Sequence, residues 1–467
     1  MKNKLLSSAL IILLALLGLS DFTIAQTISG GGYHSLALCN NGTVRAWGRN
    51  ANGQLGNGNY IDSNVPVQVF GLTNVISVAG GGLHSLALKS DGTVWAWGMN
   101  TNGQLGNGNN TTSNFPVQVN GLTGVIAISA GGVHSLALKS DGTVWAWGSN
   151  IYGRLGNGTN TDSNLPVQTS SLTGVIAIAG AGYHSLALKN DSTVWAWGYN
   201  NNGQLGNGNY SNSNVPVQTI GITKVKAIAG GGRYFSAAVK NDGTVWAWGS
   251  NAYGQLGNGA IFTGTNVPVQ ASSLTGVKNV EAGEYFTVAL KNDGTVWNWG
   301  RNDFGQLGIG NNTDSSVPVQ VTGLTGVNTI AKGEFYFHTY ALKNDNTIWS
   351  WGSNFYGQLG TGNNTTSNVI VQITNTCSII AGVNETLIGN FVSIYPNPSS
   401  GVFQLTTQLN NSEVELVEIY NLLGDKISSI EKFATPIQIN LSGITNGVYF
   451  IKLYHQSEIY IQKIIIQ

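Results

Sequence analysis

Hydrophobic and polar positions repeat about every 50 residues between residues 27 and 375. The pair Trp-Gly marks the period, and successive copies are 50, 50, 50, 51, 51 and 52 residues apart. Self-similarity at a period of this length is the signature of a repeat architecture. The seven copies begin at Trp47, Trp97, Trp147, Trp197, Trp248, Trp299 and Trp351.

Each repeat contains four strand candidates. In the third repeat they are 125–129, 134–138, 143–147 and a segment with Pro166, which favours an edge position. Asp141-Gly142 lies between two apolar runs and predicts a hairpin turn. In 144–147 the two tryptophans share one face and smaller residues share the other. Such a sheet can stack its bulky face on the small face of the next sheet, so the pattern predicts a β-propeller.

The two ends of the array differ. The first repeat starts at Thr27 without a preceding Pro-Val-Gln strand, whereas the last repeat ends in such a strand at 369–373. We therefore expect this C-terminal strand to complete the blade begun at the N-terminus and so close the ring. An open solenoid would need polar caps, and none is visible.

Three segments of each repeat resemble the repeat of the regulator of chromosome condensation family. In the second repeat they are 81–88, 91–98 and 100–106, and the resemblance covers about residues 27–375. It implies an all-β fold, with a seven-bladed β-propeller over residues 27–376. The exchange activity of the family's eukaryotic founder is not carried over, because every repeat stays within two residues of 50 and leaves no room for its blade insertion. Secreted bacterial members include inhibitors of β-lactamases, which makes a protein-binding role a fair analogy.

The first 26 residues are typical of a signal peptide. Lys2 and Lys4 precede an apolar stretch at 5–19, and Ala25 is a small residue suited to cleavage. The stretch is short for a membrane span of ~20 residues, although a membrane anchor is the alternative. No other segment reaches ~18 apolar residues, so we expect a mature protein without a membrane span.

The composition changes after residue 377. Every tryptophan lies at or before Trp351, and short strand candidates separated by turns predict a linker at 377–390 and a small β-sandwich at 391–467. The tail resembles the C-terminal sorting domain of the type IX secretion system, which implies a host of the Bacteroidota, handling by that machinery and removal of the tail at the surface. The alternative is an ordinary adhesive sandwich. The resembling residues are Tyr395, Pro396, Asn397, Pro398, Gly401, Asn446, Gly447 and Lys463.

Charge and composition exclude several classes of function. Lys+Arg and Asp+Glu both number 21, which argues against a protein that neutralises nucleic-acid phosphates. Two cysteines exclude a four-cysteine zinc site. The loop at 80–82 lacks a phosphate-binding pattern, and the loop at 103–110 has amides where calcium requires carboxylates. We expect no metal and no cofactor.

An enzyme is not expected either. His84 and Ser85 are neighbours on a strand and therefore point to opposite faces, so they cannot form a nucleophile–base pair. The histidine column contains Phe235 and Phe286 in two repeats, which favours packing over metal binding.

Positions that differ between repeats are candidates for ligand contact. Repeats 5–7 gain charged and aromatic residues before the second strand and in one outer loop, and such residues are enriched at binding hot spots. The alternative is core packing in divergent repeats. The position that holds Tyr152 in repeat 3 and Tyr253 in repeat 5 also varies between repeats, and we assign its aromatic residues to packing. The candidate binding residues are Arg233, Tyr234, Phe262, Glu284, Tyr285, Glu334, Phe335 and Tyr336.

The two cysteines predict a disulfide. Cys39 stands where other repeats have lysine, and Cys377 follows the last strand of the array. Ring closure would bring them together, and export passes through an oxidising compartment. Two separate thiols are the alternative.

Together these features predict a secreted monomer at the cell surface that binds a surface protein or glycan without catalysis. One alternative is an inhibitor of a foreign enzyme. Another is a lectin-like module, in which repeated weak sites would give multivalent sugar binding.

Overall fold

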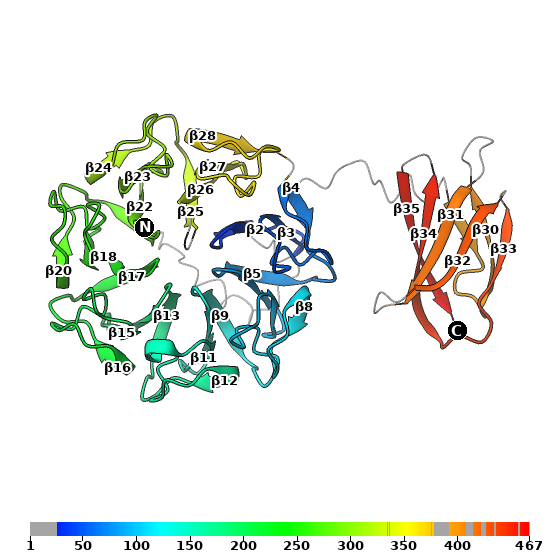
Figure 1. Ribbon diagram of the computed structural model, residues 1–467, viewed down its shortest axis with the longest axis horizontal. Coiled ribbons are helices and arrows are strands. Elements are labelled where there is room, and N and C mark those ends of the chain that lie inside the picture. The colour runs from blue at the N-terminus through cyan, green and yellow to red at the C-terminus, as the bar shows by residue number, and fades with distance from the viewer. Residues whose placement is uncertain are drawn as a thin grey trace, which may run out of the picture. The chain divides into compact units, whose positions relative to one another are not determined.

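The computed structural model describes residues 26–333, 335, 337–374, 376–377, 392–407, 414–421, 426–433, 436–455 and 458–466. The chain divides into two compact units, residues 1–377 and 378–467, called the ring and the tail below (Figure 1). The predicted signal peptide and linker lie outside the described residues, apart from Gln26 and Cys377. Within the described part of the chain, no helix has the length and apolar character needed to cross a membrane.

The ring consists of seven four-stranded antiparallel sheets, each built from consecutive strands. Blades 1–3 are β1 (Thr27–Gly30), β2 (His34–Leu38), β3 (Val44–Gly48), β4 (Ser63–Gln68); β5 (Val75–Gly80), β6 (His84–Lys89), β7 (Val94–Gly98), β8 (Ser113–Gln118); and β9 (Val125–Ala130), β10 (His134–Lys139), β11 (Val144–Gly148), β12 (Ser163–Gln168).

Blades 4–7 follow the same plan. They are β13 (Val175–Gly180), β14 (His184–Lys189), β15 (Val194–Gly198), β16 (Ser213–Gln218); β17 (Val225–Gly231), β18 (Phe235–Lys240), β19 (Val245–Gly249), β20 (Thr265–Gln270); β21 (Val277–Ala282), β22 (Phe286–Lys291), β23 (Val296–Gly300), β24 (Ser315–Gln320); and β25 (Val327–Lys332), β26 (His338–Lys343), β27 (Ile348–Gly352), β28 (Ser367–Ile373). A three-residue 3-10 turn, η2 (Ile151–Gly153), lies in blade 3.

The first strand of each blade lies toward the centre of the ring and the fourth lies at the rim (Figure 1). In blade 3, Leu138 pairs with Val144 across the Asp-Gly turn, where Gly142 takes a φ of 77° that a side chain would disfavour. Pro166 lies in the rim strand β12, which has one unpaired edge and so tolerates a residue without an N–H.

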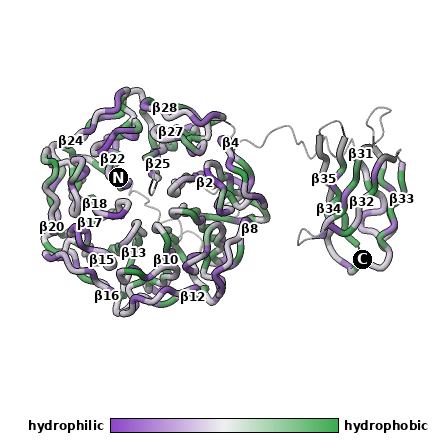
Figure 2. Tube along the Cα trace, in the orientation of Figure 1, coloured by the Kyte–Doolittle hydropathy of each residue, from purple (hydrophilic) through white to green (hydrophobic). Residues whose placement is uncertain are grey.

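The core lies between the blades. Trp147 of blade 3 packs against Leu86, Val94 and Ala96 of blade 2, so the bulky face of one sheet meets the smaller side chains of its neighbour. Figure 2 shows hydrophobic and hydrophilic segments alternating along every blade. The indole Nε1 of Trp147 also donates to the Gln104 carbonyl at 2.9 Å, and the same bond occurs at each of the seven borders.

The expected exchange of a strand between the two ends is wrong. β28 pairs with β27 and completes blade 7, while blade 1 has all four of its own strands. The reason is that each Pro-Val-Gln strand pairs with the Trp-Gly strand that precedes it, so every repeat is a self-contained blade. Blades 1 and 7 meet through side chains: Trp47 Nε1 donates to the Gln358 carbonyl at 2.8 Å, and Ile28 and Trp47 share a cluster with Tyr340.

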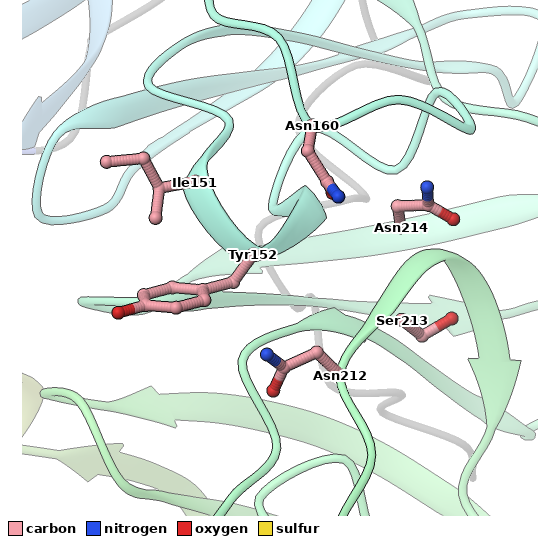
Figure 3. A pocket seen from close by; sticks show the side chains of 6 residues that line it. All are labelled: Ile151, Tyr152, Asn160, Asn212, Ser213 and Asn214. Atoms are coloured by element: carbon pink, nitrogen blue, oxygen red, sulfur yellow. The ribbon is translucent and has the colours of Figure 1, made fainter.

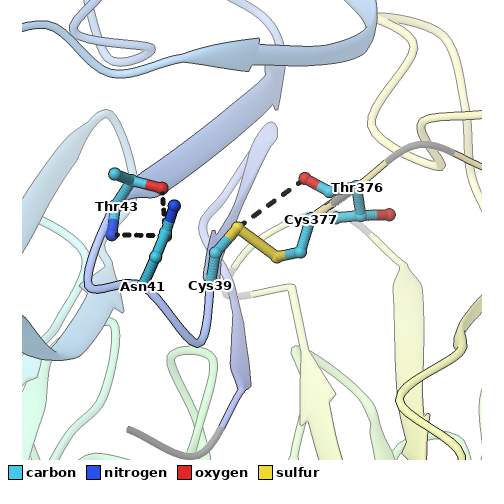
Figure 4. Close-up of a disulfide and its surroundings, with 5 residues drawn as sticks. All are labelled: Cys39, Asn41, Thr43, Thr376 and Cys377. Atoms are coloured by element: carbon cyan, nitrogen blue, oxygen red, sulfur yellow. Dashed lines mark hydrogen bonds between the residues drawn. A yellow bond between two sulfur atoms is a disulfide. The ribbon is translucent and has the colours of Figure 1, made fainter. Parts of the chain in front are cut away.

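A disulfide joins the same two blades. Cys39 follows β2, Cys377 follows β28, and their Cα atoms are 5.3 Å apart (Figure 4). In blades 2–7 the position of Cys39 is a lysine that lies over a tryptophan ring, as Lys89 lies over Trp95 at 5.6 Å. Blade 1 has Cys39 and Arg45 at these two positions, so the cysteine replaces one partner of a surface pair rather than a core residue.

The tail is a sandwich of two antiparallel sheets, with strand orders β29-β30-β33 and β32-β31-β34-β35. Phe403 and Leu405 from the first sheet pack against Val417 and Ile451 from the second. The strands are β29 (Val392–Tyr395), β30 (Val402–Thr407), β31 (Val414–Asn421), β32 (Lys426–Phe433), β33 (Ile437–Asn440), β34 (Gly447–His455) and β35 (Glu458–Ile466).

Candidate functional site

One end of the ring carries a group of aromatic side chains, most of which are partly exposed. In each blade this end is formed by the loop between the first two strands and the loop between the last two. Backbone bonds join these loops, as Arg49 N donates to Tyr33 O and Arg301 N donates to Tyr285 O. We call this end the aromatic face, and its rings are Tyr33, Tyr152, Tyr183, Tyr199, Tyr234, Tyr253, Tyr285, Phe304, Phe337, Phe355 and Tyr356.

The rings form a continuous row from blade 3 to blade 6. The centroids of Tyr152 and Tyr199 are 4.8 Å apart, and those of Tyr199 and Tyr234 are 6.5 Å apart. Tyr234 stacks on Tyr285 at 5.7 Å, and Tyr285 meets Tyr253 edge-on at 5.0 Å. Each ring is held by its neighbours, so the row presents a pre-organised surface.

Four of the five arginines of the sequence lie against these rings. The guanidinium carbon of Arg49 is 4.9 Å from the Tyr33 centroid, and that of Arg301 is 4.7 Å from the centroids of Tyr253 and Phe337. A guanidinium at this distance from a ring gains a cation–π attraction. The other two members of the group are Arg154 and Arg233.

Arg233 and Glu284 form a half-buried ion pair between blades 5 and 6. Arg233 Nε is 3.7 Å from Glu284 Oε1, and the Glu284 side chain is only 10% exposed. Burial acts to lower the pKa of Arg233, but the Glu284 carboxylate and nearby tyrosine rings hold it above its ordinary value. Burial, aided by the same carboxylate, raises the pKa of the Tyr285 hydroxyl. Tyr285 therefore stays neutral and Arg233 stays charged at physiological pH.

Phe335 lies at the centre of the ring instead of on a free surface. A Cβ on Gly82, Gly132 or Gly182 would collide with its ring, so this residue of blade 7 touches blades 2, 3 and 4. The guanidinium of Arg233 in blade 5 lies 4.9 Å from the centre of the same ring. The glycines of these three blades make room for Phe335, which is partly buried against them.

The structure brings together Arg233, Tyr234, Glu284 and Tyr285 of the predicted binding residues. Phe262 is 79% exposed on the outer loop of blade 5, and none of the described ring contacts includes it. Glu334 and Tyr336 lie outside the described residues.

Sequence reasoning missed Tyr152, Tyr183, Tyr199 and Tyr253. The column with Tyr152 and Tyr253 was assigned to packing, but Tyr152 is 39% exposed and both rings lie on the aromatic face. A signal was present, because Tyr183 comes directly before a second strand and Tyr199 directly after a third strand, and antiparallel pairing places these two positions at the same end of a blade. Tyr152 and Tyr253 lie in the loop that begins at the latter position.

Histidine and serine do pair, although between blades. His84 Nε2 is 2.9 Å from Ser135 Oγ in the next blade, and Ser135 Oγ donates to the Gln104 carbonyl. All three groups are fully buried, so no substrate reaches them. Burial lowers the pKa of His84 to about 3, which keeps the ring neutral. The described residues contain no group of side chains arranged to hold a metal ion.

In the tail, the turn after β29 is tied to the last strand. The Asn397 Oδ1 atom accepts from Ile465 N at 2.9 Å, and Ser399 N donates to Ile465 O. Tyr395 is exposed, and Gly447 begins β34 directly after Asn446. The side chain of Lys463 lies outside the described set. The remaining predicted sorting residues, Pro396, Pro398 and Gly401, lie in or directly after this turn.

A family model described as RCC1-like domain matches residues 67–388, and RCC1 repeat models match residues 25–54 and 41–88. The chain belongs to the RCC1-like domain family. Two solved structures are similar to this RCC1-like chain. Human WBSCR16 is 28% identical with a TM-score of 0.60, over 67% of this chain and 85% of that one. Prp20p of Saccharomyces cerevisiae is 25% identical with a TM-score of 0.64, over 71% and 86%.

Curated relatives of the RCC1-like chain match over a shorter part. The human E3 ubiquitin-protein ligase HERC2 is 35% identical over 134 residues, which is 28% of this chain and 3% of that protein. The ultraviolet-B receptor UVR8 of Arabidopsis thaliana is 34% identical over 133 residues, which is 28% and 30%. The match therefore spans less than a third of either relative.

The tail matches a family described as secretion system C-terminal sorting domain, over residues 393–467. A domain of this kind is handled by the type IX secretion machinery. The RCC1-like protein is therefore an exported propeller that is placed at the cell surface or released.

Proposed function

We propose that this exported propeller is a non-catalytic binding protein whose protein partner docks on the aromatic face. The observation that carries the proposal is the stacking of three partly exposed arginines, Arg49, Arg233 and Arg301, on the rings of one end of the ring. Arginine and tyrosine are the residues enriched at binding hot spots, because both combine a large contact area with hydrogen-bonding groups. The opposite end carries the Asp-Gly hairpins, which are short and polar.

Two further features support a protein partner. The rings hold one another in place, so little side-chain freedom is lost when a partner binds. Prp20p, a structural neighbour, is described together with its binding properties to Gsp1p and histones, so a ring of this fold can bind proteins. Inhibition of a foreign enzyme is a special case of the same proposal and would use the same face.

The test compares two double variants of the full chain in the exporting host. Tyr234→Ala with Tyr285→Ala removes the stacked pair at the middle of the row. Phe70→Ala with Phe115→Ala is the matched control, because these two exposed rings also meet edge-on, at 5.4 Å, and Phe70 follows the rim strand β4 at the opposite end of its blade. Cross-linking at the cell surface followed by mass spectrometry identifies the partner, and titration of that purified partner measures its affinity.

We expect the Tyr234/Tyr285 variant to bind its partner about 100-fold more weakly, the loss typical of a hot spot. The control should bind as the wild type does. Circular dichroism spectra of all the proteins must agree, which separates loss of contact from loss of fold. Equal affinities in the two variants would refute the aromatic face as the docking site. One-to-one binding that abolishes a partner enzyme's activity would identify the inhibitor case.

A further inference from the structure

Blade 3 contains an arginine where the other six blades have glutamine. In blade 2, Gln104 Oε1 accepts a hydrogen bond from the backbone N of Asn102 at 3.0 Å, and the equivalent bond occurs in blades 1 and 4–7. Arg154 has no acceptor atom, so the bond cannot form in blade 3. Its Nε instead donates to Ile151 O at 3.0 Å, and its Nη1 donates to Gly182 O at 3.3 Å.

The exchange changes the shape of the turn. Residues Ile151–Gly153 form η2, and Tyr152 takes a φ of 72°, in the left-handed region that an aromatic residue rarely adopts. Strain of this kind clusters at functional sites. The turn directs the Tyr152 ring onto Tyr199, where it stays partly exposed.

The border between blades 3 and 4 also lacks an amide pair that three other borders have. The side chains of Asn110 and Asn164 are joined by a hydrogen bond of 3.0 Å between blades 2 and 3. The borders of blades 6 and 7 and of blades 7 and 1 have the same bond. Between blades 3 and 4 both asparagines are present, but Asn214 Nδ2 donates to Gly158 O and Asn160 takes part in no described hydrogen bond.

The rearranged turn and the missing amide pair leave a hollow of about 500 Å³. This volume lies within the ~300–1,000 Å³ of most ligand sites. Figure 3 shows Tyr152 at the turn with Asn160 of the same loop beside it, Asn212 below, and Asn214 of β16 to the right. The lining residues are Ile151, Tyr152, Asn160, Asn212, Ser213 and Asn214.

The polar groups of the hollow have unused hydrogen-bonding capacity. Asn160 offers both amide atoms and Asn214 offers Oδ1, while Asn212 offers Nδ2 because its Oδ1 accepts from Asn200 N. No lining side chain carries a charge. The partly exposed Tyr152 ring presents a π surface, which is negative and attracts the positive edges of C–H groups.

We propose that this hollow binds a neutral sugar residue of a glycan. A pyranose carries hydroxyl groups that both donate and accept, which match amide pairs, and a patch of C–H groups that can lie on a tyrosine ring. An acidic sugar would find no cationic partner, because the Arg154 side chain is buried and committed to backbone carbonyls. Arginine replaces glutamine in blade 3 alone, so the rearranged turn belongs to one of the described borders, and we expect the ring to bind one sugar chain rather than seven. The inference does not depend on the protein partner proposed above.

The experiment titrates the full chain with a panel of neutral oligosaccharides (gluco-, manno-, xylo- and chito-oligomers) and with one uronic acid oligomer. The first variants are Tyr152→Ala, which removes the ring, and Asn160→Ala, which removes the unpaired amide. Asn110→Ala is the matched control, because it is the equivalent asparagine of blade 2 and its amide is already bonded to Asn164. Arg154→Gln restores the glutamine of the other six blades and with it the acceptor that holds the turn.

We expect one neutral oligomer to bind the wild type, and Tyr152→Ala, Asn160→Ala and Arg154→Gln each to weaken it about tenfold or more. Asn110→Ala should leave the affinity unchanged. If Tyr152→Ala does not fold, the affinity of Asn160→Ala tests the proposal, because Asn160 is exposed and its substitution leaves the core intact. Absence of binding at millimolar concentration, preference for the uronic acid, or equal losses in Asn160→Ala and Asn110→Ala would overturn the proposal. The Tyr234/Tyr285 variant should retain sugar binding, so this proposal can fail without the other.

Discussion

At the scale of single residues, buried histidines join blades at four borders through a hydrogen bond to a serine of the next blade. His34 Nε2 lies 2.7 Å from Ser85 Oγ, and Ser85 Oγ donates to the Gln54 carbonyl. The hydroxyl proton of the serine already lies in the bond to this carbonyl, so the imidazole Nε2 must donate to the serine oxygen. Burial lowers the pKa of His34, with smaller contributions from His84 and His338, to about 3.

The partner of the histidine changes when the histidine does. Blades 5 and 6 have Phe235 and Phe286, and the blades that follow them have Thr287 and Thr339 in place of serine. Both threonines still donate to the carbonyl that the serine would use. Threonine, which adds a methyl group, therefore occurs where the preceding blade has a phenylalanine ring. Serine occurs where the preceding blade has an imidazole.

This pairing predicts an acid-sensitive ring. An unfolded histidine titrates near pH 6.5, whereas His84 in the ring takes a proton only near pH 3. Below pH 6.5 the unfolded state binds a proton that the folded state does not, so stability falls with pH down to the folded pKa. Each such histidine contributes a slope of about 1.4 kcal/mol per pH unit. Above about pH 7 this contribution is constant.

The check is a double substitution that copies the natural pair, His84→Phe with Ser135→Thr. The free energy of unfolding is measured with urea at about pH 7.5 and about pH 4.5. Between these pH values it should fall less in the variant than in the wild type, because one histidine no longer contributes its slope of about 1.4 kcal/mol per pH unit. An unchanged pH dependence would show that His84 is protonated in the folded ring.

At the scale of elements, one loop connects blades that are not neighbours. The loop between β25 and β26 places Phe335 against glycines of blades 2, 3 and 4 and beneath Arg233 of blade 5. No contact between adjacent blades could do this, because those blades lie on the other side of the ring. The loop therefore acts as an internal brace as well as part of the aromatic face.

The brace is tested by truncating two phenylalanines that sequence reasoning grouped together. Phe335→Ala should lower the free energy of unfolding by about 1–3 kcal/mol, less than the ~3–5 of a fully buried phenylalanine, because Phe335 is only partly buried. Phe262→Ala, at an exposed loop position, should change it by less than ~0.5 kcal/mol. Urea midpoints measure both. Equal effects would mean that Phe335 carries no packing energy.

At the scale of the whole molecule, the ring is a closed cycle of equivalent borders with one that is reinforced. The border of blades 7 and 1 has the same indole-to-carbonyl bond as the others. It also has the buried Tyr340, whose hydroxyl bonds Ser35 and the Gln358 carbonyl, and the disulfide Cys39–Cys377. This is the border where the two ends of the ring meet without a covalent chain between them.

Removing the disulfide should weaken the whole ring. The bond closes a loop of 338 residues, for which the chain-entropy relation gives about 6 kcal/mol, while measured disulfides typically contribute ~2–4 kcal/mol. Cys39→Ala with Cys377→Ala should therefore lower the free energy of unfolding by about 2–4 kcal/mol in urea titrations. Wild-type protein in reductant should approach the variant. Alkylation of both cysteines in unreduced wild-type protein would contradict the bond.

The sequence alone determined the number of blades, the four strands of each and the stacking of tryptophan faces on smaller faces. These features follow from the local alternation of apolar and polar residues and from the stacking of bulky on small sheet faces. Both patterns recur in all seven repeats, so each repeat supports the same prediction. The pattern of the tail was readable for the same reason, because its turns and strands follow one another along the chain. The proximity of Cys39 and Cys377 could be expected once the ring was assumed to close.

Only the tertiary structure decided which blade contains β28, where Phe335 lies, and which tyrosines share one face of the ring. Each of these depends on residues that are far apart in the chain and that no local pattern links, such as Phe335 with Gly82 and Gly132. The hollow at Tyr152 adds a second reason. A single change from glutamine to arginine removes an acceptor, and its consequence for the turn becomes visible only where the two blades meet.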